Sequence, residues 1–217
     1  MATPPHNTPT QSPDQAASQR LYSQRCGYYD WQLAPYEHIR AQAIALLQLQ
    51  PGQTVLDVGC GTGMSLERLQ QAVGLRGQVV AVDQCADMLE HAHQRVRQHG
   101  WANVQVTCSP IERSTLPAQA DAVLFHFTHD ILQTPAAVAH VLRHLKPGAR
   151  VVATGLKWTS PLYGGMNALV WWNAVQSVTT LQGLDMPWRT LEAQGVALDI
   201  TTCLLGTIYT ASGQLKA

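Results

Sequence analysis

Three glycines in the run VLDVGCGTG, residues 55–63, are the positions best suited to ligand chemistry in this 217-residue chain. Gly59, Gly61 and Gly63 directly follow a short apolar segment and directly precede a segment with helical spacing. Glycine is needed where the backbone turns sharply and must approach a ligand with no Cβ in the way. The first turn of the helix behind such a loop offers unpaired N–H groups to a negatively charged ligand group. The run therefore predicts a ligand-binding loop between a strand and a helix.

A carboxylate follows at the end of the next apolar run. Asp83 lies 20 positions after Gly63 and closes the segment QVVAVD, residues 78–83. From the end of that strand, a carboxylate can accept hydrogen bonds from both ribose hydroxyls of an adenosine cofactor. A dinucleotide fingerprint requires a small residue where this chain has Met64, so a nicotinamide oxidoreductase is disfavoured.

Two histidines and an aspartate occur in FHFTHD, residues 125–130, at the expected carboxyl end of a fourth strand. Ligands of open α/β sheets bind beyond such strand ends, so these side chains are expected to line the site. A histidine near its ordinary pKa can deprotonate a hydroxyl or an activated carbon, which makes His126 or His129 a candidate catalytic base or acceptor-orienting group. The alternative is that Asp130 caps the next turn and the histidines only pack. The H-x-x-H spacing alone is too little to predict a metal site, and we expect none.

Strands and helices alternate from residue 54 onward, which would bring these groups to one edge of a sheet. Apolar, strand-like runs occupy 54–59, 78–83, 103–108, 121–127 and 149–156. Helical spacing occupies 64–74, 86–100 and 134–148, the last with Gly148 at its end. This alternation predicts βαβ units with right-handed crossovers. The expected fold class is α/β, a Rossmann-like open parallel sheet with helices on both faces.

The C-terminal part has a different pattern. Residues 166–181 are expected to form a largely buried helix, and 187–195 a short amphipathic one. Two strand-like runs, 197–206 and 207–213, meet at Gly206 and predict an antiparallel hairpin at one edge of the sheet.

The glycine run, Asp57 within its strand and the later Asp83 resemble the class I S-adenosylmethionine-dependent methyltransferases, and the resemblance spans about residues 28–213. The nearest subgroup by sequence is similar to the small-molecule methyltransferases related to quinone-ring methylation. The resemblance implies that S-adenosyl-L-methionine is the cofactor and that a small molecule accepts its methyl group. It also implies a seven-stranded sheet that ends in an antiparallel hairpin.

The same resemblance implies which residues bind the cofactor. Those expected to pass under its methionine and ribose are Asp57, Gly59, Cys60, Gly61 and Gly63, and Asp83 would hold the ribose. The remaining expected contacts are Tyr28, Gln84, Met88, Ser109, Pro110, Ile111 and Phe125. Members of this family often carry an aspartate where this chain has Ser109, so the contact to the adenine amino group departs from the family pattern.

Composition divides the chain and excludes several classes of protein. Residues 1–20 are polar and read as a flexible tail, 21–50 as N-terminal cap helices, and 51–217 as the methyltransferase domain. Fourteen basic residues balance fourteen acidic ones, which argues against binding to nucleic acid. Five cysteines without a CxxC pair indicate free thiols rather than disulfides or a zinc cluster. With no signal peptide and no apolar run of about 18 residues, we expect a soluble, cytoplasmic protein without an integral membrane segment.

Aromatic residues on both sides of the core suggest the kind of acceptor. Tyr28, Tyr29 and Trp31 precede the glycine run, and Trp158, Trp171 and Trp172 follow the fifth strand. Both segments connect to the edge of the sheet where the cofactor is expected, so an apolar cleft for a small hydrophobic or aromatic acceptor is predicted. The alternative is a non-catalytic protein that binds S-adenosylmethionine. The acceptor atom and the oligomeric state are left open.

Overall fold

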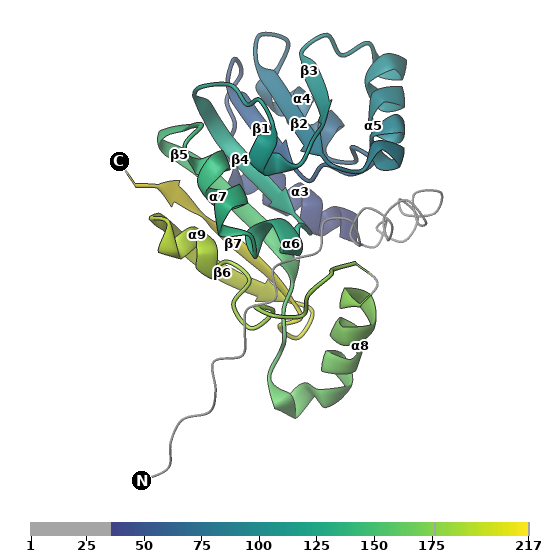
Figure 1. Ribbon diagram of the computed structural model, residues 1–217, viewed down its shortest axis with the longest axis vertical. Coiled ribbons are helices and arrows are strands. Elements are labelled where there is room, and N and C mark those ends of the chain that lie inside the picture. The colour runs from purple at the N-terminus through teal and green to yellow at the C-terminus, as the bar shows by residue number, and fades with distance from the viewer. Residues whose placement is uncertain (1–35, 176, 217) are drawn as a thin grey trace.

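A seven-stranded sheet forms the centre of the computed structural model, which describes residues 36–175 and 177–216. The strands lie in the order β3-β2-β1-β4-β5-β7-β6 (Figure 1). Their bounds are Thr54–Val58 (β1), Gln78–Asp83 (β2), Val104–Cys108 (β3), Ala120–His126 (β4), Leu145–Leu156 (β5), Val196–Cys203 (β6) and Ile208–Leu215 (β7). Strands β1 to β5 are parallel, and β7 runs antiparallel to both β5 and β6. The predicted fold class and the C-terminal hairpin are confirmed.

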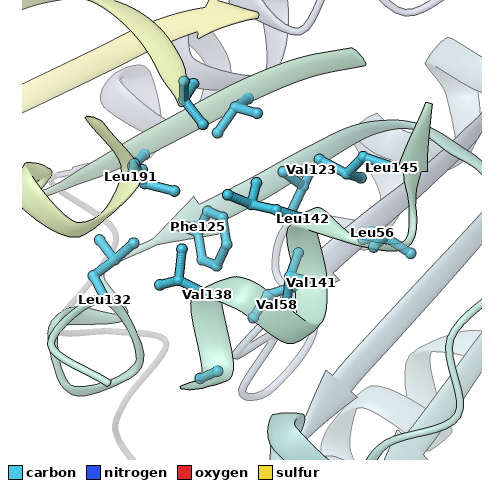
Figure 2. Close-up of a cluster of buried hydrophobic side chains, with 14 of the residues drawn as sticks. Leu56, Val58, Val123, Phe125, Leu132, Val138, Val141, Leu142, Leu145 and Leu191 are labelled. Carbon is cyan, nitrogen blue, oxygen red and sulfur yellow. The ribbon is translucent and has the colours of Figure 1, made fainter. Parts of the chain in front are cut away.

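Helices cover both faces of the sheet. Their bounds are Glu37–Leu46 (α3), Leu66–Val73 (α4), Ala86–His99 (α5), His129–Leu132 (α6), Pro135–Leu142 (α7), Gly164–Ala174 (α8) and Arg189–Ala193 (α9). Alternate residues of one strand enter different cores: Val55 packs with residues of α3, α4 and α5, whereas Leu56 packs with residues of α7 and α9. Figure 2 shows the second of these cores, in which Phe125 of β4 lies beside Val138 of α7. Burial on both faces explains why these strands read as continuous apolar runs.

The predicted helix 134–148 ends early. Helix α7 stops at Leu142, and β5 begins at Leu145, which pairs with Ala120 of β4. The next aligned pair is Ala122 with Arg150, so the residues between Leu145 and Arg150 bulge out of the ladder. Pro147 has no N–H to donate to a ladder, and Gly148 has a φ of +77° that turns the bulge. Gly148 therefore ends a bulge and not a helix.

The prediction of a largely buried helix at 166–181 is also wrong. Helix α8 ends at Ala174, and most of its side chains are exposed, including Leu169 at 54% and Trp172 at 61%. Only Val170 and Ala174 are buried among the side chains described in this helix. A segment that is apolar on all sides is usually buried, so its composition gave no sign of this exposure.

The N-terminal region is described from Tyr36 onward. The predicted tail, 1–20, and the first part of the predicted cap, 21–35, lie outside the described residues. Within the remaining cap, α3 shares a core with the sheet, because Ala43 and Ile44 pack in the same buried cluster as Val152 of β5. None of the helices that the structure describes is long and apolar enough to cross a membrane.

Candidate functional site

The glycine loop connects β1 to α4 at the carboxyl edge of the sheet. The backbone N–H groups of Gly59 and Cys60 donate to the carbonyl of Val82, at 2.8 and 3.2 Å, which fastens the loop to β2. Gly59 has a φ of +73°, and a Cβ there would lie 2.4 Å from Cγ2 of Thr128, the residue before α6. Only glycine permits both this backbone conformation and this close approach.

Gly63 has a visible packing role. A Cβ at this position would lie 2.7 Å from Cδ1 of Leu66 and 3.0 Å from Cβ of Ala92. Gly63 therefore allows α4 and α5 to pack closely against the loop. Its contact with the cofactor stays a prediction.

Asp83 lies beneath the same loop, at the end of β2. Its Oδ2 accepts from the N–H of Gly61 and its Oδ1 from the N–H of Cys85, both at 2.9 Å. Burial raises the pKa of Asp83, and the backbone N–H groups that hydrogen-bond to it oppose the rise. A carboxylate offers about four lone-pair sites, so each oxygen retains capacity for a ligand hydroxyl. Asp83 can thus support the loop and bind ribose at the same time.

A pocket lies beside the loop. Its lining residues are Arg40, Asp57, Gly59, Cys60, Gly61, Thr62, Met64, Ser65 and His126. Four buried polar atoms of these residues have no hydrogen-bond partner in the described part of the chain: Arg40 Nε, Asp57 Oδ2 and the two ring nitrogens of His126. An unpaired buried polar group costs about 1–3 kcal/mol, so a ligand that pairs with these atoms would recover that free energy.

Arg40 supplies a buried positive charge from α3. Its side chain is 2% exposed and pairs with the carboxylate of Glu37, which also accepts from Nε of Arg68 at 2.9 Å. The unpaired Nε leaves part of the planar guanidinium available to a second acceptor. Guanidinium groups favour carboxylates and phosphates, so Arg40 is suited to an anionic ligand group.

Asp57 supplies a carboxyl group whose pKa lies close to neutral pH. Its pKa is raised from 3.8 to about 7: burial is the largest cause, the positive charge of Arg40 opposes the rise, and the negative charge of Asp83 adds to it. A cationic ligand group beside the unpaired Oδ2 would favour the ionised form. Together, Arg40 and Asp57 can bind the two charges of an α-amino-acid group.

His126 enters the pocket as a neutral ring. Burial, together with the smaller effect of the positive charge of Arg40, lowers its pKa from 6.5 to about 3. A base with such a pKa takes up a proton poorly at neutral pH. One ring nitrogen can donate and the other can accept, so His126 is suited to orienting a ligand by hydrogen bonds.

The structure separates His129 and Phe125 from this pocket. Nε2 of His129 lies 2.9 Å from the carbonyl of Gln182, and Phe125 lies in the core shown in Figure 2. Burial lowers the pKa of His129, whose bond to the Gln182 carbonyl opposes the change. The residues that the structure describes include no group of three side chains placed to hold a metal ion. The cofactor contact predicted for Phe125 and the catalytic role predicted for His129 stay predictions.

The residues expected around the adenine gather near the carboxyl ends of β2 and β3. The N–H of Ser109 donates to the carbonyl of Asp83 at 2.9 Å, and Oγ of Ser109 donates to the carbonyl of Pro110 at 3.0 Å. Met88 and Ile111 are buried, and Gln84 is half-buried. Tyr28 lies outside the described residues. These adenine contacts also stay predictions.

Arg40 is the main site residue that the sequence analysis missed. Within the expected cap helices, Arg40 precedes the apolar residues Ala43 by three positions and Ile44 by four. Residues three and four apart share a helix face, so this spacing would have placed Arg40 on the buried side. An arginine on the buried face of a helix that leads to a glycine loop was the available signal.

Comparisons with known proteins show that part of this chain is similar to methyltransferases. Residues 55–148 match a family model described as a methyltransferase domain. The 2-phytyl-1,4-naphtoquinone methyltransferase of Trichormus variabilis is 31% identical over 128 residues, which are 56% of this chain and 55% of that protein. The malonyl-[acyl-carrier protein] O-methyltransferase of Anoxybacillus flavithermus is 31% identical over 122 residues, which are 56% of this chain and 45% of that protein. The chain thus spans about half the length of these curated relatives.

A solved structure shows the same fold. The N-methyltransferase NodS from Bradyrhizobium japonicum, in complex with S-adenosyl-L-homocysteine, matches with a TM-score of 0.69 and 14% identity over 92% of this chain and 99% of that one. Residues 55–148 thus match a methyltransferase domain, and the seven-stranded sheet with its C-terminal antiparallel hairpin has the fold of solved methyltransferase structures.

Proposed function

We propose that this protein transfers the methyl group of S-adenosylmethionine to a small apolar or aromatic acceptor. The observation that supports this most is that a buried cation, Arg40, and a buried carboxyl group, Asp57, line the same pocket beside the glycine loop. The methionine end of the cofactor carries one carboxylate and one ammonium group, and its other end carries a ribose. The pocket and Asp83 offer a partner for each.

The residues present therefore fit the cofactor. Arg40 would bind its carboxylate, Asp57 its ammonium group and Asp83 its ribose hydroxyls, while Gly59 and Gly61 allow close approach of the backbone. When bound, the cofactor supplies an electrophilic methyl group on a sulfonium ion. The chain's own contribution is to hold donor and acceptor in line, which can supply a large part of the rate enhancement.

We assign His126 the role of orienting the acceptor or the cofactor. Its ring lines the pocket, remains neutral at physiological pH and has two nitrogens available for hydrogen bonds. His129 contacts the carbonyl of Gln182 instead. Of the two histidines, His126 is the one that we expect to affect turnover.

The apolar character of the acceptor is inferred from the chain that leaves β5. Residues 158–184 contain no charged side chain, and they include Trp158, Trp171 and Trp172. A cleft walled by such residues would bind a flat or hydrophobic molecule mainly through burial of apolar area. The Trichormus relative, which is named as a methyltransferase of a phytyl naphthoquinone, is consistent with an acceptor of this kind.

Transfer of label from S-adenosylmethionine tests the proposed function. The protein is incubated with methyl-labelled cofactor and a cell metabolite extract, and the labelled products are identified. We expect a labelled small molecule with the wild type and at least a tenfold lower rate with His126→Ala. A wild-type protein that binds the cofactor but labels no product from any extract would instead be a non-catalytic binding protein.

A further inference from the structure

The connection between β5 and α9, residues 157–188, begins beside the pocket. Thr154 of β5 pairs with His126 of β4, and its carbonyl accepts from the N–H of Phe127 at 2.8 Å. The connection therefore leaves the sheet at the edge to which His126 belongs. Figure 1 shows its helix, α8, standing apart from the sheet beyond α6.

Helix α8 has little packing of its own to hold it in place. Val170 is 2% exposed and Ala174 is fully buried, whereas Leu169 and Trp171 are 54% and 49% exposed. The apolar face that would meet an acceptor is therefore positioned mainly by the segments before and after the helix.

Helix α6 and the next residue, Gln133, hold the segment that follows α8 through side-chain hydrogen bonds. Both carboxylate oxygens of Asp130 accept from the N–H of Thr179, at 3.2 and 3.0 Å, and Oδ2 also accepts from Oγ1 of Thr179 at 2.9 Å. Nε2 of Gln133 donates to the carbonyl of Pro187 at 3.2 Å. Bonds to a carboxylate are the stronger of these, so Asp130 is the main attachment.

The other side of the same turn contacts the glycine loop. A Cβ on Gly59 would lie 2.4 Å from Cγ2 of Thr128 and 3.1 Å from Cδ1 of Ile131. Residues 128–133 thus touch the glycine loop through Thr128 and Ile131, and hold the returning connection through His129, Asp130 and Gln133.

We propose that Asp130 is a positioning residue for the methyl acceptor. Through its hydrogen bonds to Thr179, Asp130 fixes the connection, including helix α8, relative to the glycine loop. This inference rests on the proposed function, because it assumes that the connection forms the acceptor side of the site. Its consequence is that loss of the Asp130 carboxylate weakens acceptor binding and leaves cofactor binding intact.

Two variants at this contact and one conservative control test the proposal. Asp130→Asn replaces one accepting oxygen by a donor that faces the Thr179 N–H, and Thr179→Val removes the hydroxyl. Thr179→Ser keeps the hydroxyl and the backbone N–H. Thr179→Val also provides the answer if Asp130→Asn does not fold.

The measurements are made on the full chain with S-adenosylhomocysteine and with a dilution series of one metabolite extract. We expect the half-saturating extract concentration to rise about tenfold for Asp130→Asn and about threefold for Thr179→Val. Thr179→Ser should stay within twofold of the wild type. The affinity for S-adenosylhomocysteine, measured by calorimetry, should change less than twofold in all three variants. Amide exchange in residues 177–187 should accelerate in Asp130→Asn and Thr179→Val.

The outcomes separate the proposal from the function on which it rests. Unchanged half-saturation in Asp130→Asn and Thr179→Val, with active wild type, would overturn the positioning role and leave methyl transfer standing. A fall in cofactor affinity equal to the loss of acceptor affinity would also overturn it, because the contact would then serve the whole fold. Failure of the wild type to transfer label would overturn both, even if amide exchange confirms the attachment of the connection.

Discussion

The cofactor half of the molecule, β1 to β4, and the connection after β5 are held in place by different means. In the cofactor half, strand residues such as Leu56 and Val80 are buried on both faces of the sheet, and the loop is fixed by backbone hydrogen bonds to Val82. In the connection, α8 exposes most of its apolar side chains, and Asp130 attaches the segment after it. The cofactor half is therefore stabilised by the core of the sheet, whereas the connection is attached to that core mainly by hydrogen bonds.

This difference suits the two substrates of the proposed methyl transfer. The cofactor is the same in every turnover and carries fixed charges, which buried groups such as Arg40 and Asp57 can match. The acceptor varies among relatives that share this fold, and an apolar surface outside the core can change without loss of the sheet. Four variant experiments and one ligand comparison test this contrast.

The largest effect on stability is expected at Gly59. Gly59→Ala places a Cβ 2.4 Å from Thr128 at a φ of +73° and should lower the free energy of unfolding by about 3 kcal/mol, from backbone strain plus the clash. Gly100→Ala is the matched control, with a φ of +64° and no atom within 4 Å of the new Cβ, and should lower it by only about 1 kcal/mol. Equal losses in a urea titration would show that the loop is not confined by α6.

The next effect concerns the charge on α3. Arg40→Met keeps much of the side-chain volume but removes the cation and should weaken binding of S-adenosylhomocysteine about 100-fold, since hydrogen bonds to charged groups contribute about 1.5–3 kcal/mol. Arg97→Met, an exposed arginine of α5, should leave the affinity unchanged. Similar affinities of the two variants in calorimetry would show that Arg40 does not contribute to cofactor binding.

Two buried groups should give opposite pH dependences of stability. Asp57 has a raised pKa, so the folded state binds more protons than the unfolded state, and its contribution to stability falls as the pH rises from about 4 to about 7. His126 has a lowered pKa, so its contribution rises between about pH 3 and pH 6.5.

Single variants separate the two contributions. The stability of Asp57→Asn relative to wild type should increase with pH over the acidic range, and that of His126→Gln should decrease, each by at most about 1.4 kcal/mol per pH unit. Denaturant titrations at several pH values measure both slopes. A pH-independent difference for either variant would mean that the group is not buried as described.

The smallest effect on stability is expected on the exposed face of α8. Leu169→Ser changes a half-exposed side chain and should alter the free energy of unfolding by less than about 0.5 kcal/mol, while the half-saturating acceptor concentration rises. Val170→Ser, one residue later but 2% exposed, should lower the free energy of unfolding by about 2–3 kcal/mol. Strong destabilisation by Leu169→Ser would place the exposed face of α8 in the core instead.

The sequence predicted the cofactor half better than the connection, for physical reasons. Strands buried on both faces are continuous apolar runs, and the positions of the loop that need a positive φ are glycines. Both features can therefore be recognised from the sequence alone. The exposure of α8 depends on which other segments cover it, and its composition, apolar on all sides, contains no such information. The sequence also gave no sign that His126 lines the pocket while His129 contacts the carbonyl of Gln182, because the backbone turns between them at Phe127, whose φ is +57°.

The most direct test of the charged pocket compares two ligands that differ only in the amino-acid end. S-adenosylhomocysteine carries the carboxylate and ammonium groups, and methylthioadenosine keeps the adenosine but lacks both. By calorimetry, the wild type should bind S-adenosylhomocysteine about 100-fold more tightly than methylthioadenosine, and Arg40→Met should reduce this ratio to less than about tenfold. Equal affinity of the wild type for the two ligands, or an unchanged ratio in Arg40→Met, would contradict the assignment of Arg40 and Asp57 to the methionine end of the cofactor.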